Sequence, residues 1–94
     1  IGEGFVVPTV NERLRGLCSD IRAKVANSGV ANSLCQKIEN AVDSLIKGNI
    51  GPGINKLEAL INEIQAQSGL KITVEDAAAW MKLVRQFIAG LKLL

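Results

Sequence analysis

The segment from Ser33 to Ile64 constrains the fold of this chain most strongly, because it has the pattern of two amphipathic helices joined by a short turn. Leucine, isoleucine and alanine recur at intervals of three and four residues on both sides of Gly48-Asn49. This period gathers apolar side chains on one face of an α-helix, and a Gly-Asn pair is typical of a helix end. The segment therefore predicts an antiparallel helical hairpin.

The same spacing occurs before and after this hairpin, in a first helix that ends near Ala26 and a last helix that follows Thr73. The apolar stripes are Val10, Leu14, Leu17, Cys18, Ile21 and Val25 in the first helix, and Ala77, Met81, Val84, Ile88 and Leu91 in the last. No segment alternates with a period of two over a useful length, so no sheet is expected. Short connections make successive helices antiparallel. The sequence predicts an all-α fold, an up-down four-helix bundle with an extended N-terminal segment.

Local signals set the expected limits of the first helix. Residues 9–12 (Thr-Val-Asn-Glu) form a capping box, which predicts a helix start, and Asn27-Ser28-Gly29 is expected to end the helix with Gly29 at positive φ. Residues 1–8 contain two glycines and a proline without a helical period, so an extended segment is expected there. The domain prediction is a lead-in or linker remnant over 1–8 and a four-helix bundle over 9–94.

The limits of the last two helices have similar signals. The third helix is expected to begin between Asn49 and Pro52 and to end at Ser68-Gly69, because proline fits the first turn of a helix and glycine fits its end. Thr73 is expected to cap the last helix. Acidic residues follow Thr73 in the first turn, where the helix dipole favours negative charge.

Composition and charge weigh against a nucleic-acid partner. The 94 residues carry 11 basic and 9 acidic side chains, a net charge of +2, which is too small to predict an electrostatic partner. The longest basic stretch contains Arg13, Arg15, Arg22 and Lys24 and is interrupted by acidic residues. No aromatic residue lies beside it to stack on a base, so nucleic-acid binding is not expected.

Two cysteines, Cys18 and Cys35, and the absence of histidine limit the chemistry. A Cys-His metal site or catalytic pair cannot form, and the spacing of the cysteines is not that of a redox or metal-binding motif. A disulfide and two buried thiols remain as interpretations. Antiparallel pairing of the first two helices places residue 18 opposite about residue 38, within one turn of Cys35, so the disulfide is favoured.

A structural disulfide favours an oxidising compartment. The chain begins with Ile1 rather than methionine, which leads us to expect a processed or excised chain. No apolar run approaches the roughly 20 residues that span a bilayer. These features predict a secreted or extracellular protein.

Several short motifs follow one another in a recognisable register. They are Ser33-Leu34, Lys37 to Ala41 (Lys-Ile-Glu-Asn-Ala), Gly48-Asn49, Ile54 to Asn62 and Gly69 to Thr73. Together they resemble the FIMAH-type module, a small helical domain near the C-termini of large secreted bacterial and archaeal proteins. The resemblance covers most of the chain and implies a non-catalytic accessory domain, with no catalytic residues to transfer. The cysteine pair and Gly51-Pro52-Gly53 depart from the pattern.

Candidate catalytic and ligand-binding groups are few. Glu58 and Glu63 point to different faces of one helix, and neither has a nucleophile nearby. Ser19 and Asp20 are adjacent, and they form no triad without histidine. The glycine-rich segment 48–53 follows a helix and lacks the Lys-Ser/Thr pair of a phosphate loop, so it is interpreted as a turn. We expect no catalytic residue, no cofactor, no metal site and no enzymatic activity.

Trp80 is the most distinctive side chain of the last helix. It lies beside the main apolar stripe, Phe87 follows seven residues later on the same edge, and Leu91 adds to the apolar C-terminal end of the helix. One interpretation is that these side chains fill the core. The other is an aromatic edge that contacts a partner or an apolar ligand, which makes Trp80, Phe87 and Leu91 the candidate contact residues.

Two functions fit these observations. The first is a non-catalytic interaction or accessory module of a secreted or surface protein, which binds a protein, a cell-envelope component or a second copy of itself. The alternative is a small carrier of lipid or another apolar ligand, or a membrane-active bundle. A carrier is expected to hold an apolar cavity on the order of a few hundred Å³ between its helices. A module is expected to have a solid core and an apolar surface patch instead.

Overall fold

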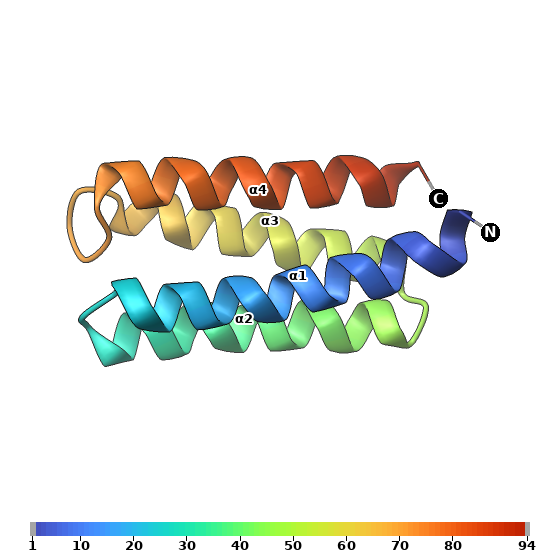
Figure 1. Cartoon of the computed structure of the whole chain (residues 1–94), viewed down its shortest axis with the longest axis horizontal. Coiled ribbons are helices and arrows are strands. Elements are labelled where there is room, and N and C mark those ends of the chain that lie inside the picture. The colour runs from blue at the N-terminus through green and yellow to red at the C-terminus, as the bar shows by residue number, and fades with distance from the viewer. Residues whose placement is uncertain (1, 94) are drawn as a thin grey trace.

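The computed structural model of the chain describes residues 2–93, with side chains described from Val10 to Leu93. Four helices follow one another in the chain: α1 (Gly2–Lys24), α2 (Ser28–Ile46), α3 (Ile50–Gln67) and α4 (Val74–Lys92). Figure 1 shows that each helix runs antiparallel to the one before it. Residues 2–93 contain no strand. The prediction of an all-α, up-down four-helix bundle is confirmed.

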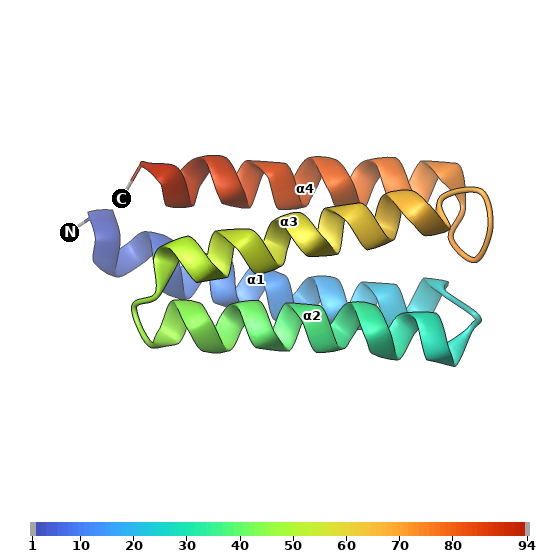
Figure 2. The ribbon, with the colours of Figure 1, turned by 180° about the vertical axis from the view of Figure 1, so that it is seen from behind.

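The helices are arranged in a ring in chain order. α1 packs on α2, α2 on α3 and α3 on α4, whereas α4 packs least closely against α1. α1 and α4 share the near face in Figure 1, and Figure 2 shows the opposite face, which α2 and α3 share. The bundle measures 40 × 19 × 19 Å. The seam between α1 and α4 is therefore the most open of the four.

An aliphatic core fills the space between the helices. The apolar stripes predicted for the helices converge there and form one contiguous cluster. Its fully buried members are drawn from all four helices and include Leu14, Ile21, Leu34, Ile38, Leu45, Leu57, Leu60, Ile64, Val84 and Leu91. Removal of this apolar surface from water provides most of the free energy that opposes the conformational entropy of the unfolded chain.

The N-terminal segment differs from the prediction. The chain is helical from Gly2 onwards, so an extended lead-in over 1–8 is wrong for residues 2–8, and Thr9 lies inside α1 rather than at its start. Pro8 lacks the amide hydrogen that would bond to the carbonyl group one turn earlier, which bends a helix without necessarily ending it. Figure 1 shows the first turns of α1, in dark blue, leaving the line of the rest of the helix.

The connection between α1 and α2 also begins earlier than predicted. α1 ends at Lys24, and Asn27 caps α2 by accepting a hydrogen bond from the Val30 amide at 2.9 Å. Gly29 therefore lies in the first turn of α2 and does not end α1 at positive φ. The side chain of Asn27 thus provides an acceptor for an amide that has no partner within the helix.

The other two connections follow the predicted signals. Gly48 and Gly69 have φ of 82° and 77°, a conformation that glycine adopts without steric cost. Each follows the C-cap residue of its helix, Lys47 for α2 and Ser68 for α3. Thr73 caps α4 by accepting a hydrogen bond from the Asp76 amide at 3.2 Å. Ile72 is buried and holds the last connection against the core.

A disulfide joins α1 to α2. Cys18 and Cys35 are bonded, and their Cα atoms are 5.2 Å apart, which confirms the pairing expected from the antiparallel helices. A cross-link that closes a loop of this size contributes on the order of 3 kcal/mol by restricting the unfolded chain.

Polar side chains fix the register of α2 against α3. Glu63 on α3 accepts a hydrogen bond from the Ser33 hydroxyl at 3.0 Å and pairs with Lys37. Nearer the turn, Lys56 donates to the buried Ser44 hydroxyl at 2.6 Å. Because these contacts join two levels of the same pair of helices, a shift of α3 along α2 would break all of them.

Gly53 allows α2 and α3 to approach closely near their turn. A Cβ atom at this position would lie 2.6 Å from Cδ2 of Leu45 and 3.0 Å from its Cγ. Both residues are buried. Gly53 therefore has a packing role, and α3 starts within the predicted limits.

Gly53→Ala is expected to destabilise the bundle by about 1–3 kcal/mol, because the new methyl group would displace the packed side chain of Leu45. Gly16→Ala is the matched control, since Gly16 is exposed in the interior of α1 and a Cβ there would meet nothing within 4 Å. The control is expected to leave stability unchanged or to raise it by about 0.5–1 kcal/mol. Urea unfolding measures both variants. Equal free energies of unfolding would contradict the packing role of Gly53.

Candidate groove between α1 and α4

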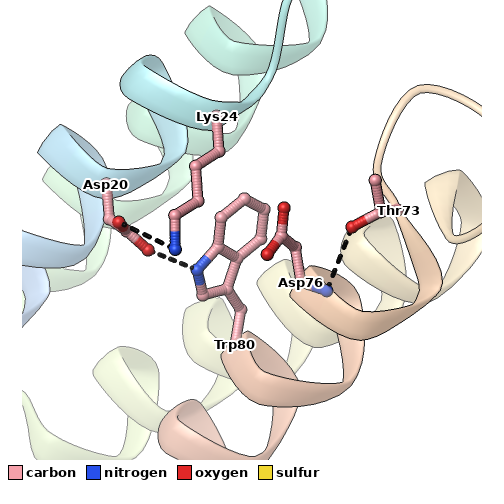
Figure 3. A network of polar contacts seen from close by, with 5 residues as sticks. All are labelled: Asp20, Lys24, Thr73, Asp76 and Trp80. Atoms are coloured by element: carbon pink, nitrogen blue, oxygen red, sulfur yellow. Dashed lines mark hydrogen bonds and ion pairs between the residues drawn. The ribbon is translucent and has the colours of Figure 1, made fainter.

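Trp80 connects α4 to α1 at the open seam (Figure 3). Its ring is buried, and its Nε1–H donates to Oδ2 of Asp20 on α1 at 2.8 Å. The other carboxylate oxygen of Asp20 lies 3.4 Å from Nζ of Lys24, one turn further along α1. The indole therefore fills the core and also joins the two helices that pack least closely.

Two hollows lie along the seam on either side of Trp80. One has a volume of about 410 Å³, and Gly16, Leu17 and Leu83 are among its lining residues. The other has a volume of about 430 Å³, and Ala79 and Leu83 are among its lining residues. Both are open to solvent. Together they form a groove, named here the α1–α4 groove, whose residues are Arg13, Gly16, Leu17, Asp20, Lys24, Asp76, Ala79, Trp80, Lys82, Leu83 and Gln86.

The floor of the groove is apolar and its sides are low. Leu17 and Trp80 are buried and Leu83 is half-buried, so these side chains form the floor. Gly16 and Ala79 are exposed, and they carry almost no side chain. A molecule that binds in the groove can therefore approach the backbones of the two helices closely at these positions.

A third hollow lies on the other side of α4, against α3. It has a volume of about 520 Å³ and is lined by Glu58, Ile61, Asn62, Arg85, Ile88 and Lys92. Ile61 and Ile88 are nearly buried, and the remaining lining residues are polar or charged and exposed. α4 thus borders all three hollows, although only the α1–α4 groove has a continuous apolar floor.

The candidate contact residues lie in the core. Trp80, Phe87 and Leu91 are 3%, 4% and 1% exposed, which matches the core-filling interpretation. Phe87 and Leu91 do not line any of the three hollows. Trp80 borders both hollows of the α1–α4 groove, so of the three residues it alone has a position at a surface feature.

The carboxylates considered for catalysis are separated in the structure. Glu63 contacts Ser33 and Lys37 where α3 packs on α2, whereas Glu58 lies at the hollow between α3 and α4. Asp20 is held by Trp80 and Lys24. Over residues 2–93, no group of three or more histidine, cysteine or acidic side chains is arranged to hold a metal ion. None of the helices in that range is long and apolar enough to cross a membrane.

Sequence reasoning missed most of the groove. The hydrogen bond between Asp20 and Trp80 joins residues that are far apart in the chain, so no local pattern indicated it. A partial signal was present in α4, because Leu83 lies off the main apolar stripe and Ala79 occupies an exposed position where a longer side chain would be usual. Together these residues mark a second, weaker apolar edge on the helix.

Comparisons with protein-family models, with curated proteins and with solved structures gave no significant match.

Trp80→Ala is expected to lower the free energy of unfolding by about 3–5 kcal/mol, because it removes a large buried side chain. Trp80→Phe retains most of the apolar volume but loses the hydrogen bond to Asp20. It is expected to lower the free energy of unfolding by about 1–2 kcal/mol. Chemical denaturation of the two variants measures the difference. A loss below about 1 kcal/mol for Trp80→Ala would contradict its role in the core.

Proposed function

We propose that this chain is a non-catalytic helical interaction module of a secreted or surface protein, and that it binds a protein or cell-envelope partner in the α1–α4 groove. The observation that supports this most directly is the combination of a contiguous aliphatic core with a surface groove whose floor is apolar. Grooves between helices are common docking sites for helical partners.

The shape of the hollows favours a partner over a carried ligand. A carrier of lipid surrounds most of the apolar surface of its ligand. The hollows beside α4 are large enough to hold part of such a ligand, but they are open to solvent and include charged side chains. A partner that covers the groove from outside would bury the same apolar floor and leave the core unchanged.

The disulfide supports the secreted or surface location. Cross-links of this kind persist in oxidising compartments and are rare where thiols are kept reduced. The resemblance to FIMAH-type modules agrees with this location and with an accessory role beside other domains. The resemblance does not indicate which residues contact the partner. The experiment is therefore designed from the groove.

The proposal is tested by photo-crosslinking from the groove. Ala79 is replaced by a benzophenone-bearing amino acid, and the chain is incubated with the secreted and envelope fractions of its source cells. A covalent adduct with a protein or an envelope component is expected, because Ala79 is exposed at the groove. Glu39 is the matched control position, since it is exposed on α2, which lies diagonally across the bundle from α4.

Two outcomes would contradict the proposal. One is equal crosslinking from positions 79 and 39, which would show that the groove is not a preferred surface. The other is a lipid-sized adduct on the chain in native mass spectrometry of protein purified from its source. That adduct would favour the carrier, the alternative function.

A further inference from the structure

The charges along the α1–α4 groove divide into those with a partner in the chain and those without one. Asp20 accepts a hydrogen bond from Trp80 and pairs with Lys24, so these two charges offset each other. Arg13 and Lys82 are exposed, and neither forms an ion pair with another residue in the range 10–93. Asp76 also lines the groove and forms no ion pair in that range, so the groove has two cations and one carboxylate without an ion-pair partner among these residues.

The free charges have an order along the groove. Because Trp80 lies opposite Asp20, antiparallel pairing places Arg13 level with about residue 87 of α4, at a rise of about 1.5 Å per residue. Lys82 lies between this level and that of Trp80. Asp76 lines the other end, in the first turn of α4, where the helix N-terminus favours a negative charge. The half of the groove toward the C-terminus of α4 is therefore cationic.

The floor beneath these cations fits a helix. Leu17, Trp80 and Leu83 provide an apolar strip between α1 and α4, and Gly16 leaves the α1 side open, since a Cβ there would meet nothing within 4 Å. The two hollows follow the direction of the helices. A helix laid along this strip would pack as a further member of the bundle, by the same side-chain interdigitation that joins the other helices.

We propose that the α1–α4 groove binds an acidic amphipathic helix of a partner protein. The apolar face of this helix lies on Leu17 and Leu83, and its carboxylates lie beside Arg13 and Lys82. This inference rests on the proposed function and specifies the chemistry of the partner. It also explains why two cations border an apolar floor without any acidic side chain of the described chain to pair with them.

A membrane surface fits the same groove less well. Peripheral binding to a bilayer needs large apolar side chains that protrude beside the cations. The large apolar side chains that are exposed on the described chain are Ile46, Leu70, Val74 and Leu93. All four lie at helix ends or in a connection, and none lines the groove.

The test uses the 94-residue chain and two synthetic peptides. The acidic probe is a peptide of about 18 residues, about 27 Å when helical, with leucine at every third or fourth position and glutamate at most others. The control peptide has lysine in place of each glutamate. Trp80 is the only tryptophan of the chain and borders both hollows, so its fluorescence reports occupation of the groove.

The acidic probe is expected to change the Trp80 emission with saturation, and the lysine peptide is expected to bind at least about tenfold more weakly. Binding of the acidic probe should weaken as salt is raised. Arg13→Glu and Lys82→Glu are each expected to weaken it about fivefold or more. Lys47→Glu is the matched control, because Lys47 is exposed at the end of α2, which lies diagonally across the bundle from α4. Circular dichroism confirms that all variants are folded.

Equal binding of the two peptides, or no binding of either, would overturn the inference. So would a change in Trp80 emission with phosphatidylglycerol vesicles but not with the acidic probe, which would indicate a membrane surface. The crosslinking experiment separates this inference from the proposed function. A protein adduct at position 79 whose yield is unchanged by Lys82→Glu would retain the interaction module and exclude an acidic partner.

Discussion

The close packing of α2 on α3 is the constraint on which the rest of the bundle depends. Gly53 brings the two helices together at one end, and Glu63 with its partners fixes their register further along. The remaining helices attach to this pair from its two sides, α1 through packing and a disulfide, and α4 through packing on α3. The ring is completed by the seam between α4 and α1, the two neighbouring helices that pack least closely.

This arrangement of the helices explains where the groove lies. Helices of similar length with apolar stripes of similar width bury their largest side chains toward a common axis. At the α1–α4 seam, the outward positions beside the stripe hold Gly16 and Ala79. Side chains this small cannot cover the strip beneath them, and among residues 10–93 the hydrogen bond between Trp80 and Asp20 is the polar contact that crosses it. The groove is therefore a consequence of residue size at a few outward positions and needs no irregularity in the backbone.

Most of the fold could be predicted from the sequence, because periodicity and turn residues act locally. The apolar stripes, the glycines after α2 and α3 and the Thr73 cap all lie where the pattern placed them. The errors fell where two local signals competed. Pro8 favoured an extended segment and the capping box a helix start after it, but the helix continues through both. Asn27 capped α2 where Gly29 was expected to end α1. The disulfide was predictable only because antiparallel geometry brings Cys18 near Cys35. The groove was not predictable, since it depends on which helices meet around the ring and on a contact between Asp20 and Trp80.

The position of the disulfide has a consequence for how the bundle opens. It ties the middle of α1 to α2, so these two helices remain joined in any partly unfolded state that retains oxidised cysteines. α3 and α4 have no such tie, and α4 borders the seam that packs least closely. Local unfolding proceeds through the parts with the fewest buried contacts, so we expect α4 to exchange its amide hydrogens with solvent before α2 and α3. The helix that forms one wall of the groove is thus also the one whose order a bound partner would increase most.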